Sequence, residues 1–345
     1  MIGIGVIGFG YWGPNLVRNF HEMMDSRVLA VSDQRMDRLA LAASRYPGIG
    51  IMQNPSELIR SPAVDAVVIA TPVSTHFQLA MEALRAGKHV LVEKPLAMTS
   101  EQSWQLIEEA ERRHLVLMVD HTFVYTGSVR KMKELIDAGE VGDLYYYDSV
   151  RVNLGLFQHD VNVLWDLAVH DLSIMDHLLP TRPRAVSATG MRHFTQEPEN
   201  IAYLTLFYDS SLIAHIHVNW LAPVKVRRTL IGGSQKMIIY DDVEPSEKVK
   251  VYDRGVTTES QQAHSEVVYK MQMGYRAGDM WAPQLDLSEA LKTGARHFLD
   301  CIARCEVPVT NGEVGARIVQ VLEAASRSMR DRGRLIELDT LKVAA

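Results

Sequence analysis

Two patterns of apolar and polar residues divide the chain. Over the first 120 residues, short apolar runs alternate with segments whose apolar residues recur at helical spacing. This alternation is typical of an α/β domain, in which helices cover both faces of a parallel sheet. We predict strands at 4–7, 28–32, 66–70, 89–92 and 115–119, and helices at 14–24, 36–46, 75–86 and 100–114.

After residue 120, most strand patterns follow one another with only turn residues between them. This order predicts a second, α+β domain with a large, open, mostly antiparallel sheet. We expect domains at 1–121 and 122–345, and the last helices could pack back on the first domain. The polar segment 257–278 is a candidate lid. We predict strands at 144–153, 185–193, 202–208, 212–220, 225–231, 236–240 and 248–252, and helices at 129–138, 162–179, 288–304 and 313–330.

Composition and charge argue against nucleic-acid and membrane partners and are those of an ordinary globular protein. The 345 residues are 47% hydrophobic and 23% charged, as in ordinary globular proteins. The net charge of −6 offers no basic field for a nucleic acid. Cys301 and Cys305, four apart on a predicted helix, are expected to be reduced, packed thiols. Because Met1 leads straight into a strand and no apolar run is long enough to span a membrane, we expect a cytoplasmic protein with no membrane partner.

The segment Gly8–Gly13 has the spacing of a dinucleotide-binding loop. It follows a predicted strand and opens a helix, which is the context that the GxGxxG motif requires. Gly8 would permit the tight turn, Gly10 the approach of a pyrophosphate, and Gly13 close packing of helix on strand. The alternative is a glycine-rich turn without a ligand. The other candidate cofactor residues of this loop are Phe9, Tyr11 and Trp12.

Asp33 ends the second predicted strand, twenty residues after Gly13. A carboxylate there can accept hydrogen bonds from the adenosine ribose and would repel a 2′-phosphate, which favours NAD over NADP. Arg35 complicates this prediction, because an arginine can pair with that phosphate. Gln34, between them, is a further candidate for cofactor binding.

Two further segments are expected beside the nicotinamide half of the cofactor. Thr71 and Pro72 follow the third strand that we predict, and His76 lies in the first turn of the next helix. Taken alone, His76 fits a hydrogen-bonding role at the helix start better than a catalytic one.

Lys94 follows a strand directly and precedes Pro95, which fixes a non-helical exit. A lysine at a strand's carboxyl end, next to a cofactor, can donate a hydrogen bond to a substrate oxygen and relay a proton. Glu93 could hold this lysine or contact the cofactor. The alternative is a surface Glu–Lys pair before a turn.

Asp166 and His170 lie four residues apart on a predicted helix, in a polar stripe with Asn162, Ser173 and His177. An aspartate one turn from a histidine can orient it as a general base. The alternatives are a solvated polar face and a metal site. Asp166 and His170 have no third ligand at matching spacing, so we predict no metal. The opposite, apolar stripe is Leu164, Ala168, Leu172, Met175 and Leu179.

These motifs together resemble the glucose–fructose oxidoreductase / inositol dehydrogenase (GFO/IDH/MocA) family over essentially the full length. The resemblance rests on the glycine loop, Ala70-Thr71-Pro72 with His76, Glu93-Lys94-Pro95, and Asp166 with His170. It implies an N-terminal Rossmann domain and a C-terminal domain whose sheet often packs against another subunit, giving a homodimer or homotetramer. It also implies Lys94, Asp166 and His170 as the catalytic set.

The resemblance implies an NAD-dependent oxidoreductase acting on a secondary hydroxyl of a sugar, and weaker similarity in segments 219–227 and 275–279 favours a sugar nucleotide or amino sugar. A cyclitol dehydrogenase of inositol type is one alternative, and a non-catalytic NAD-binding sensor is another. Arginines suit a phosphate or carboxylate and aromatics suit sugar faces. Besides Lys94 and His170, candidate substrate residues are His121, Phe123 and Tyr125, on one face if extended, and Arg151, Asn153, Gln158, Asn162, Tyr275 and Arg276.

Overall fold

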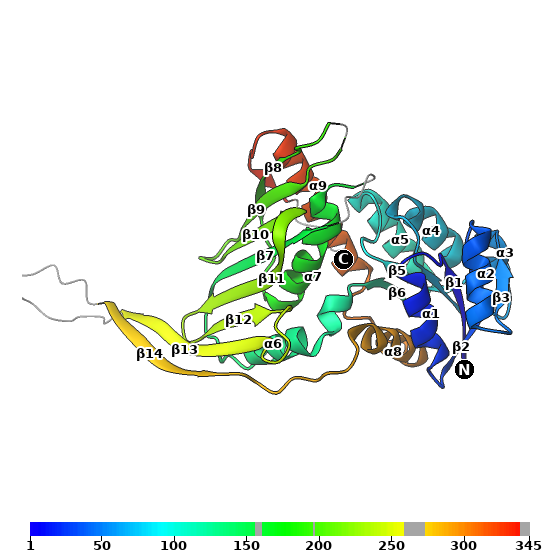
Figure 1. The fold of residues 1–345 in the computed structure, drawn as a ribbon, viewed down its shortest axis with the longest axis horizontal. Helices are drawn as coiled ribbons and strands as arrows, with labels where there is room; N and C mark the ends of the chain where they lie inside the picture. The colour runs from blue at the N-terminus through cyan, green and yellow to red at the C-terminus, as the bar shows by residue number, and fades with distance from the viewer. Residues whose placement is uncertain (156–160, 196, 259–272, 339–345) are drawn as a thin grey trace, which may run out of the picture. The chain divides into compact units, whose positions relative to one another are not determined.

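The computed structural model describes residues 1–155, 161–195, 197–258 and 273–338 (Figure 1). Side chains in strands are described except at 256–258 and 273–275. The chain divides into two compact units, which are treated one at a time. Unit 1 comprises Met1–Thr126 with Leu287–Glu323, and unit 2 comprises Gly127–Asp286 with Ala324–Ala345.

Unit 1 is built on a parallel sheet of six strands in the order β3-β2-β1-β4-β5-β6. Because the strands are parallel, their carboxyl ends lie at one edge of the sheet. The strands are β1 Ile2–Ile7, β2 Ser26–Ser32, β3 Gly50–Met52, β4 Ala66–Ile69, β5 His89–Glu93 and β6 Leu117–Asp120; the helices are α1 Gly13–His21, α2 Met36–Arg45, α3 Pro55–Arg60, α4 His76–Arg85, α5 Ser100–Arg112 and α8 Ala290–Arg304.

Both faces of this sheet are buried, which explains its continuous apolar strands. On one face, Val6 packs in a cluster with Leu16 and Phe298, and on the other Ile7 packs in a separate cluster with Leu84. Each fully buried side chain of this size contributes about 1.5–3 kcal/mol relative to exposure. Helix α8 and the first part of α9 (Gly312–Arg330) belong to this unit.

Two elements of unit 1 were not predicted. Strand β3 has three residues, too few to show a period, and α3 has six. The signal for α3 was local: the side chain of Asn54 accepts a hydrogen bond from the backbone N–H of Ser56, at 3.0 Å, and Pro55 fills the first turn.

Unit 2 is built on a sheet of nine strands in the order β14-β13-β12-β11-β7-β10-β9-β8-β15. Only β7 and β10 pair in parallel among the strand pairs described. The fold class predicted from the sequence is therefore confirmed. The strands are β7 Leu144–Leu154, β8 Ala185–Met191, β9 Ile201–Phe207, β10 Ile213–Asn219, β11 Leu221–Gly233, β12 Met237–Asp241, β13 Val249–Thr258, β14 Met273–Trp281 and β15 Ile336–Glu337; the α-helices are α6 Gly127–Asp137 and α7 Val169–Leu178.

The segment 257–278 differs from the loose connection that we predicted. Its two ends belong to β13 and β14, which pair as antiparallel strands from Thr258 and Met273 onward. Its central part, which includes the core of the predicted lid, lies outside the described residues. Among the described helices, none combines the length and apolarity needed to cross a membrane.

A buried ion pair ties α7 to the sheet of unit 2. The Arg151 Nε atom on β7 lies 2.6 Å from Asp171 Oδ2 on α7, and each side chain is 3% exposed. Ser149 donates a further hydrogen bond to Asp171 Oδ1 at 2.7 Å. Charges this deeply buried are tolerated only when they are paired and hydrogen-bonded.

Replacing Asp171 by Asn should therefore lower the free energy of unfolding by about 3–5 kcal/mol, because the Arg151 charge would stay buried without its partner. Asp241→Asn is the matched control: it breaks the exposed pair with Arg228 on the same sheet and should cost less than about 1 kcal/mol. Urea denaturation followed by circular dichroism measures both. Equal losses in the two variants would contradict the role of the buried pair.

Candidate active site

The glycine loop between β1 and α1 is constrained at its two ends and open in its middle. A Cβ atom on Gly8, whose φ is +97°, would lie 2.3 Å from the carbonyl oxygen of Ala70, and one on Gly13 would lie 2.1 Å from the carbonyl oxygen of Gly8. Neither position can hold a side chain. At Gly10 the nearest atom is Arg35 Nη2 at 3.6 Å, so the backbone there is accessible, as a bound pyrophosphate would require.

The other residues of the loop divide into buried and exposed positions. Phe9 is fully buried, and its backbone N–H donates to Asp33 Oδ2 at 2.8 Å. Tyr11 and Trp12 are 83% and 40% exposed and pack edge to face. Gln34 is exposed, and its carbonyl oxygen accepts from Gln53 Nε2 at 3.0 Å.

Asp33 lies just beyond β2, nearly buried beside Arg35. Its Oδ1 atom accepts from the backbone N–H of Arg35 at 2.9 Å and from Arg35 Nε at 3.2 Å. Burial alone would raise the pKa of Asp33, but the hydrogen bonds from Arg35 and Phe9 and the Arg35 charge outweigh it and lower that pKa. Asp33 is therefore ionised at neutral pH and holds the guanidinium that could otherwise receive a phosphate.

His76 joins the turns that follow β4 and β5. Its Nε2 atom lies 2.8 Å from the carbonyl oxygen of Thr71, and its Nδ1 atom lies 2.8 Å from the carbonyl oxygen of Pro95. The ring is 1% exposed, and burial lowers its pKa against the raising effect of these two bonds. Thr71 also bonds Thr75 through their hydroxyls at 2.7 Å, and Pro72 precedes the 3₁₀ turn Val73–Thr75. His76 thus holds Thr71 and the residue after Lys94 at a common edge.

Lys94 follows β5 at the carboxyl edge of the parallel sheet, the edge at which the glycine loop leaves β1. Its backbone N–H donates to Glu93 Oε2 at 3.3 Å. Glu93 is the last residue of β5, and its register partner on β6 is Asp120. The two residues are 7% and 4% exposed, so both carboxyl groups are buried on paired positions of neighbouring strands.

Two buried carboxyl groups that face each other across neighbouring strands disfavour a state in which both are ionised. Burial, then the Asp120 charge, raise the pKa of Glu93 well above its usual value, although Lys94 opposes them. Burial raises the pKa of Asp120 to about 6, against bonds from Thr122 and Glu93 and the charge of Lys94. Burial and the Asp120 charge thus favour the protonated form of Glu93, and the Lys94 charge opposes protonation of both carboxyl groups.

Sequence reasoning missed Asp120. The available signal was its position: like Glu93, it ends an apolar strand of a predicted parallel sheet, and carboxyl ends of neighbouring strands meet at one edge. What the sequence did not supply was that β6 is the neighbour of β5.

The three candidates that follow β6 do not share one face as predicted for an extended chain, because Thr122–Tyr125 is a 3₁₀ helix. His121 is 1% exposed and Phe123 is half-buried. Tyr125 is 6% exposed, and its hydroxyl lies 3.0 Å from Thr310 Oγ1. Burial raises the pKa of that hydroxyl. Their contact with substrate stays a prediction.

In unit 2, the helix that we predicted over 162–179 contains an irregularity at the candidate residues. Leu164–Ala168, with Asp166, forms a π-helical turn, and the regular helix α7 begins at Val169, so Asp166 and His170 are not one ordinary α turn apart. Such turns occur frequently at functional sites. The indole Nε1 of Trp220 donates to Asp166 Oδ2 at 3.0 Å and fixes the carboxylate.

The two stripes of this helix are only partly as predicted. Every residue of the apolar stripe is at most 4% exposed, as expected. On the polar stripe His170 is half-buried, whereas Ser173 is fully buried and its hydroxyl donates to the His170 carbonyl oxygen at 2.7 Å. Asn162 caps the segment, since its Oδ1 accepts from the N–H of Leu164 at 3.1 Å.

The remaining substrate candidates have different surroundings. Arg151 is enclosed with Asp171, as described above, whereas Asn153, two residues along β7, is half-buried. Arg276 on β14 pairs with Asp253 Oδ1 at 2.9 Å. Gln158 lies outside the described residues, and so does the side chain of Tyr275. Their contacts with substrate stay predictions.

No group of three or more His, Cys, Asp or Glu side chains that could hold a metal ion occurs among the described residues. The residues of unit 1 instead fit a dinucleotide, because the open backbone at Gly10 and the ionised Asp33 match its pyrophosphate and its ribose.

Comparison with known proteins agrees with this geometry. The model of an oxidoreductase family with an NAD-binding Rossmann fold matches residues 2–121, and the model of the GFO/IDH/MocA C-terminal domain matches residues 129–239. The resemblance predicted from the motifs is confirmed.

Two curated relatives and one solved structure show the range of similarity. An inositol 2-dehydrogenase of Saccharopolyspora erythraea is 37% identical, covering 67% of this chain and 71% of that protein. A UDP-N-acetylglucosamine 3-dehydrogenase of Acidithiobacillus ferrooxidans is 30% identical, covering 74% and 78%. A crystal structure of the latter enzyme superposes with a TM-score of 0.80 at 26% identity, covering 96% of this chain and 99% of that one.

The carboxyl pair should make folding stability depend on pH. A carboxyl group with a raised pKa in the folded state stabilises that state fully below its unfolded pKa and loses this contribution as the pH rises through its folded pKa. For Asp120 the window runs from 3.8 to about 6, and for Glu93 it extends upward from 4.5. Relative to the variant Glu93→Gln/Asp120→Asn, the wild type should lose on the order of 2 kcal/mol as the pH rises through this window.

Urea denaturation at a series of pH values measures this difference. Asp331→Asn, which changes an exposed aspartate, is the control and should give a curve parallel to that of the wild type. A curve for the double variant that is also parallel to the wild type would show that the pair holds no proton.

Proposed function

Because the chain belongs to the GFO/IDH/MocA oxidoreductase family, we propose that it transfers a hydride between a nicotinamide and a secondary hydroxyl of a sugar, either nucleotide-linked or an amino sugar. That it is an NAD-binding oxidoreductase acting on CH–OH groups follows from its relatives. One observation carries the proposal: the glycine loop leaves β1 and Lys94 leaves β5, two parallel strands separated by β4, at the same edge of one sheet.

In the proposed reaction, bound nicotinamide supplies the hydride acceptor at its ring. The side chain of Lys94 donates a hydrogen bond to the carbinol oxygen and stabilises the charge that develops on it. His170 takes the hydroxyl proton. Asp166, whose carboxylate accepts a hydrogen bond from Trp220, orients the imidazole of His170. In this proposal the carbinol oxygen loses its proton to His170 as the carbinol carbon loses its hydride to the nicotinamide.

NAD is the proposed cofactor rather than NADP. The support is the ionised Asp33 carboxylate, which would accept from the ribose hydroxyls and repel a 2′-phosphate. In the proposed site, the loop residues Gly8–Gly13 bind the pyrophosphate, and Gln34, Thr71, Pro72, His76 and Glu93 complete the set around the two nucleoside halves.

An inositol-type cyclitol is the second candidate substrate, and the 37% identity to an inositol 2-dehydrogenase favours it. Inositol and sugar nucleotides share secondary carbinols, so the same chemistry serves both. They differ in charge, since a sugar nucleotide carries a diphosphate.

We also propose a homodimer or homotetramer formed through the sheet of unit 2. Tyr203, Phe207 and Ile213, on the neighbouring strands β9 and β10, are 43%, 39% and 44% exposed. Large apolar side chains exposed on an open sheet face are typical of surfaces that bind another subunit. A cytoplasmic location is proposed as well, and the free thiols of Cys301 and Cys305 fit a reducing compartment.

Activity with a panel of carbinols tests the proposed function. Purified protein with NAD⁺ should reduce it with at least one sugar, sugar nucleotide or cyclitol, and Lys94→Ala should lower kcat about 100-fold or more while NADH still binds. Lys292→Ala, which changes an exposed lysine on α8, is the control and should keep wild-type turnover. Unchanged turnover in Lys94→Ala would remove the lysine from the mechanism.

Cofactor preference should depend on Asp33. The wild type should bind NADH more tightly than NADPH, and Asp33→Asn should narrow this ratio by about tenfold, because it removes the negative charge and releases Arg35. Asn keeps an acceptor for the N–H of Phe9. Fluorescence titration measures both affinities, with Asp37→Asn as the exposed control. Tighter binding of NADPH by the wild type would contradict the assignment.

A further inference from the structure

The carboxylate of Asp33, the residue after β2, already has a donor at each of its acceptor positions. An ionised carboxylate offers about four such positions, shared between its two oxygens. Oδ2 accepts from the backbone N–H of Phe9 at 2.8 Å and from Arg35 Nη2 at 3.4 Å. Oδ1 accepts from the backbone N–H of Arg35 at 2.9 Å and from Arg35 Nε at 3.2 Å. The ribose hydroxyls that we assign to Asp33 can therefore bind only if one or more of these donors leaves.

The two bonds from the Arg35 side chain are the ones that can open. At 3.2 and 3.4 Å they are longer than the two backbone bonds, at 2.8 and 2.9 Å. The Arg35 side chain is 53% exposed, whereas that of Asp33 is 8% exposed, and an ion pair with one partner in solvent contributes little to folding stability. The backbone donors belong to the glycine loop and to the residue before α2, so they stay in place.

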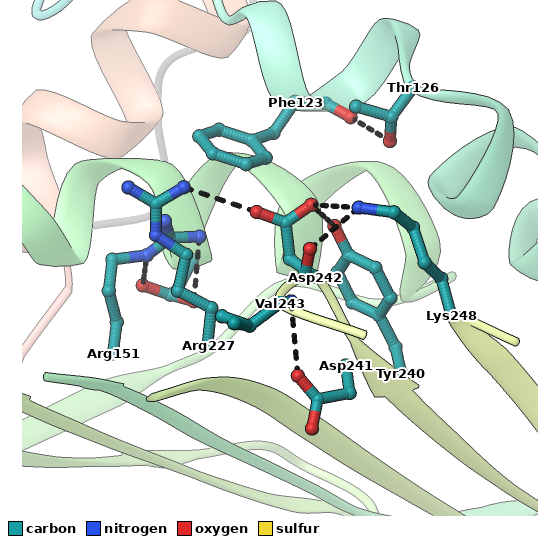
Figure 2. A network of polar contacts seen from close by, with 10 residues as sticks. Phe123, Thr126, Arg151, Arg227, Tyr240, Asp241, Asp242, Val243 and Lys248 are labelled. Atoms are coloured by element: carbon teal, nitrogen blue, oxygen red, sulfur yellow. Dashed lines mark hydrogen bonds and ion pairs between the residues drawn. The ribbon is translucent and has the colours of Figure 1, made fainter. Parts of the chain in front are cut away.

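An aspartate of unit 2 shows how a pair with a structural role differs. In Figure 2, Arg227 and Lys248 are directed toward the carboxylate of Asp242. Arg227 Nη1 lies 3.1 Å from Asp242 Oδ2, and the two residues are 15 positions apart, one on β11 and the other just after β12. Opening that pair would separate two elements of the sheet. Arg35 and Asp33 are only two positions apart, so opening their side-chain bonds separates no elements.

The Arg35 guanidinium also borders the part of the glycine loop that is open to a ligand. A Cβ atom on Gly10 would have Arg35 Nη2 as its nearest neighbour, at 3.6 Å. A guanidinium binds phosphate through a planar fork of N–H donors. Once released from Asp33, Arg35 would present this fork at the adenosine ribose, where NADP differs from NAD by one phosphate on the 2′ oxygen.

We propose that Asp33 and Arg35 form a cofactor selector, a pair that opens in one of two ways. For NAD, Arg35 gives up its side-chain bonds to Asp33 and the ribose hydroxyls take these positions, so Arg35 opposes the binding of this cofactor. For NADP, Arg35 leaves Asp33 and pairs with the 2′-phosphate, so this cofactor binds through Arg35. The inference rests on the proposed function and deepens it, since it adds NADP as a second, weaker cofactor and names Arg35 as a specificity residue.

Arg35 should therefore act in opposite directions on a hydroxyl and on a phosphate at the 2′ position of the ribose. Removing its side chain frees two acceptor positions on Asp33 for hydroxyls. The same change takes away the partner of a phosphate and leaves that phosphate beside the Asp33 charge. An arginine that only held Asp33 in place would affect both ligands in the same direction, so the signs of the two effects separate selection from support.

Fluorescence titration of NADH and NADPH measures the phosphate half of the proposal without requiring hydride transfer. The titrations are carried out at pH 8, far above the ordinary carboxyl pKa of 3.8, so that Asp33 stays ionised. Arg35→Met keeps the backbone N–H at position 35 and removes the fork, and it should raise the ratio of Kd for NADPH to Kd for NADH about tenfold or more. Arg45→Met removes an exposed arginine from the far end of α2; it is the matched control and should change this ratio less than about twofold.

Competition against bound NADH measures both halves with smaller ligands. Adenosine carries the ribose hydroxyls, adenosine 2′-monophosphate carries a phosphate at the 2′ position, and neither has the pyrophosphate that the glycine loop would bind. Arg35→Met should bind adenosine about threefold more tightly, because no guanidinium has to leave Asp33. It should bind adenosine 2′-monophosphate about tenfold or more weakly, and Arg35→Lys, which keeps the charge, should recover part of this loss.

Several results would overturn the selector. They are an unchanged Kd ratio in Arg35→Met, weaker binding of adenosine by this variant than by the wild type, and no binding of NADPH by the wild type. A loss of affinity for both small ligands that Arg35→Lys does not recover would leave Arg35 a structural role alone and would also overturn it. Circular dichroism confirms that each variant is folded.

The outcomes for the selector and for the proposed function are distinct. If Arg35→Met shifts the binding of the two cofactors as expected but no carbinol reduces NAD⁺, the selector stands and the proposed function fails. If a carbinol is oxidised with NAD⁺ and Arg35→Met changes neither the Kd ratio nor the binding of adenosine, the proposed function stands and the selector fails.

Discussion

Unit 1 depends on the close approach of the glycine loop to the end of β4. Gly8 packs so closely on the Ala70 carbonyl that no side chain fits between them. This contact fixes the glycine loop and the start of α1 in position relative to the turn after β4. From that turn the ring of His76 packs between the carbonyl oxygens of Thr71 and Pro95, 2.8 Å from each, and its single N–H donates to one of them, which links this turn to the exit of β5. The carboxyl edge of the sheet is thus held by one close backbone contact and by one buried side chain, His76.

In unit 2, a buried ion pair fixes the position of α7 on the sheet. The Arg151–Asp171 pair fastens α7 to β7 at the residue next to His170, and Trp220 holds Asp166 from the sheet side. The π-helical turn adds a residue between these two anchors, so the helix meets both only with that irregularity in place. Rigid anchors on each side of a candidate base limit its positions, which acid–base chemistry requires.

Local signals predicted much of the fold and of the candidate site, and long-range pairing explains the rest. The glycine loop, Asp33 and Lys94 were found because each depends on a few neighbouring residues and a strand end. Asp120 was missed because its role comes from pairing of β5 with β6. Arg151 was named as a candidate substrate residue, and its burial could not be predicted because its partner lies twenty residues away. The π-helical turn was not predicted, because the spacing of apolar residues along a helix does not reveal one extra residue in a turn.

The substrate is the property that fold and cofactor loop determine least. A structure superposing with a TM-score of 0.80 over nearly the whole chain shares only 26% of its residues, so most side chains have been replaced on a retained backbone. Relatives named for an inositol and for a sugar nucleotide are 37% and 30% identical to the chain over 67% and 74% of its length. Because both substrates present secondary carbinols, catalytic residues cannot distinguish them. The distinction must come from groups that recognise what differs between the two substrates, namely their charge.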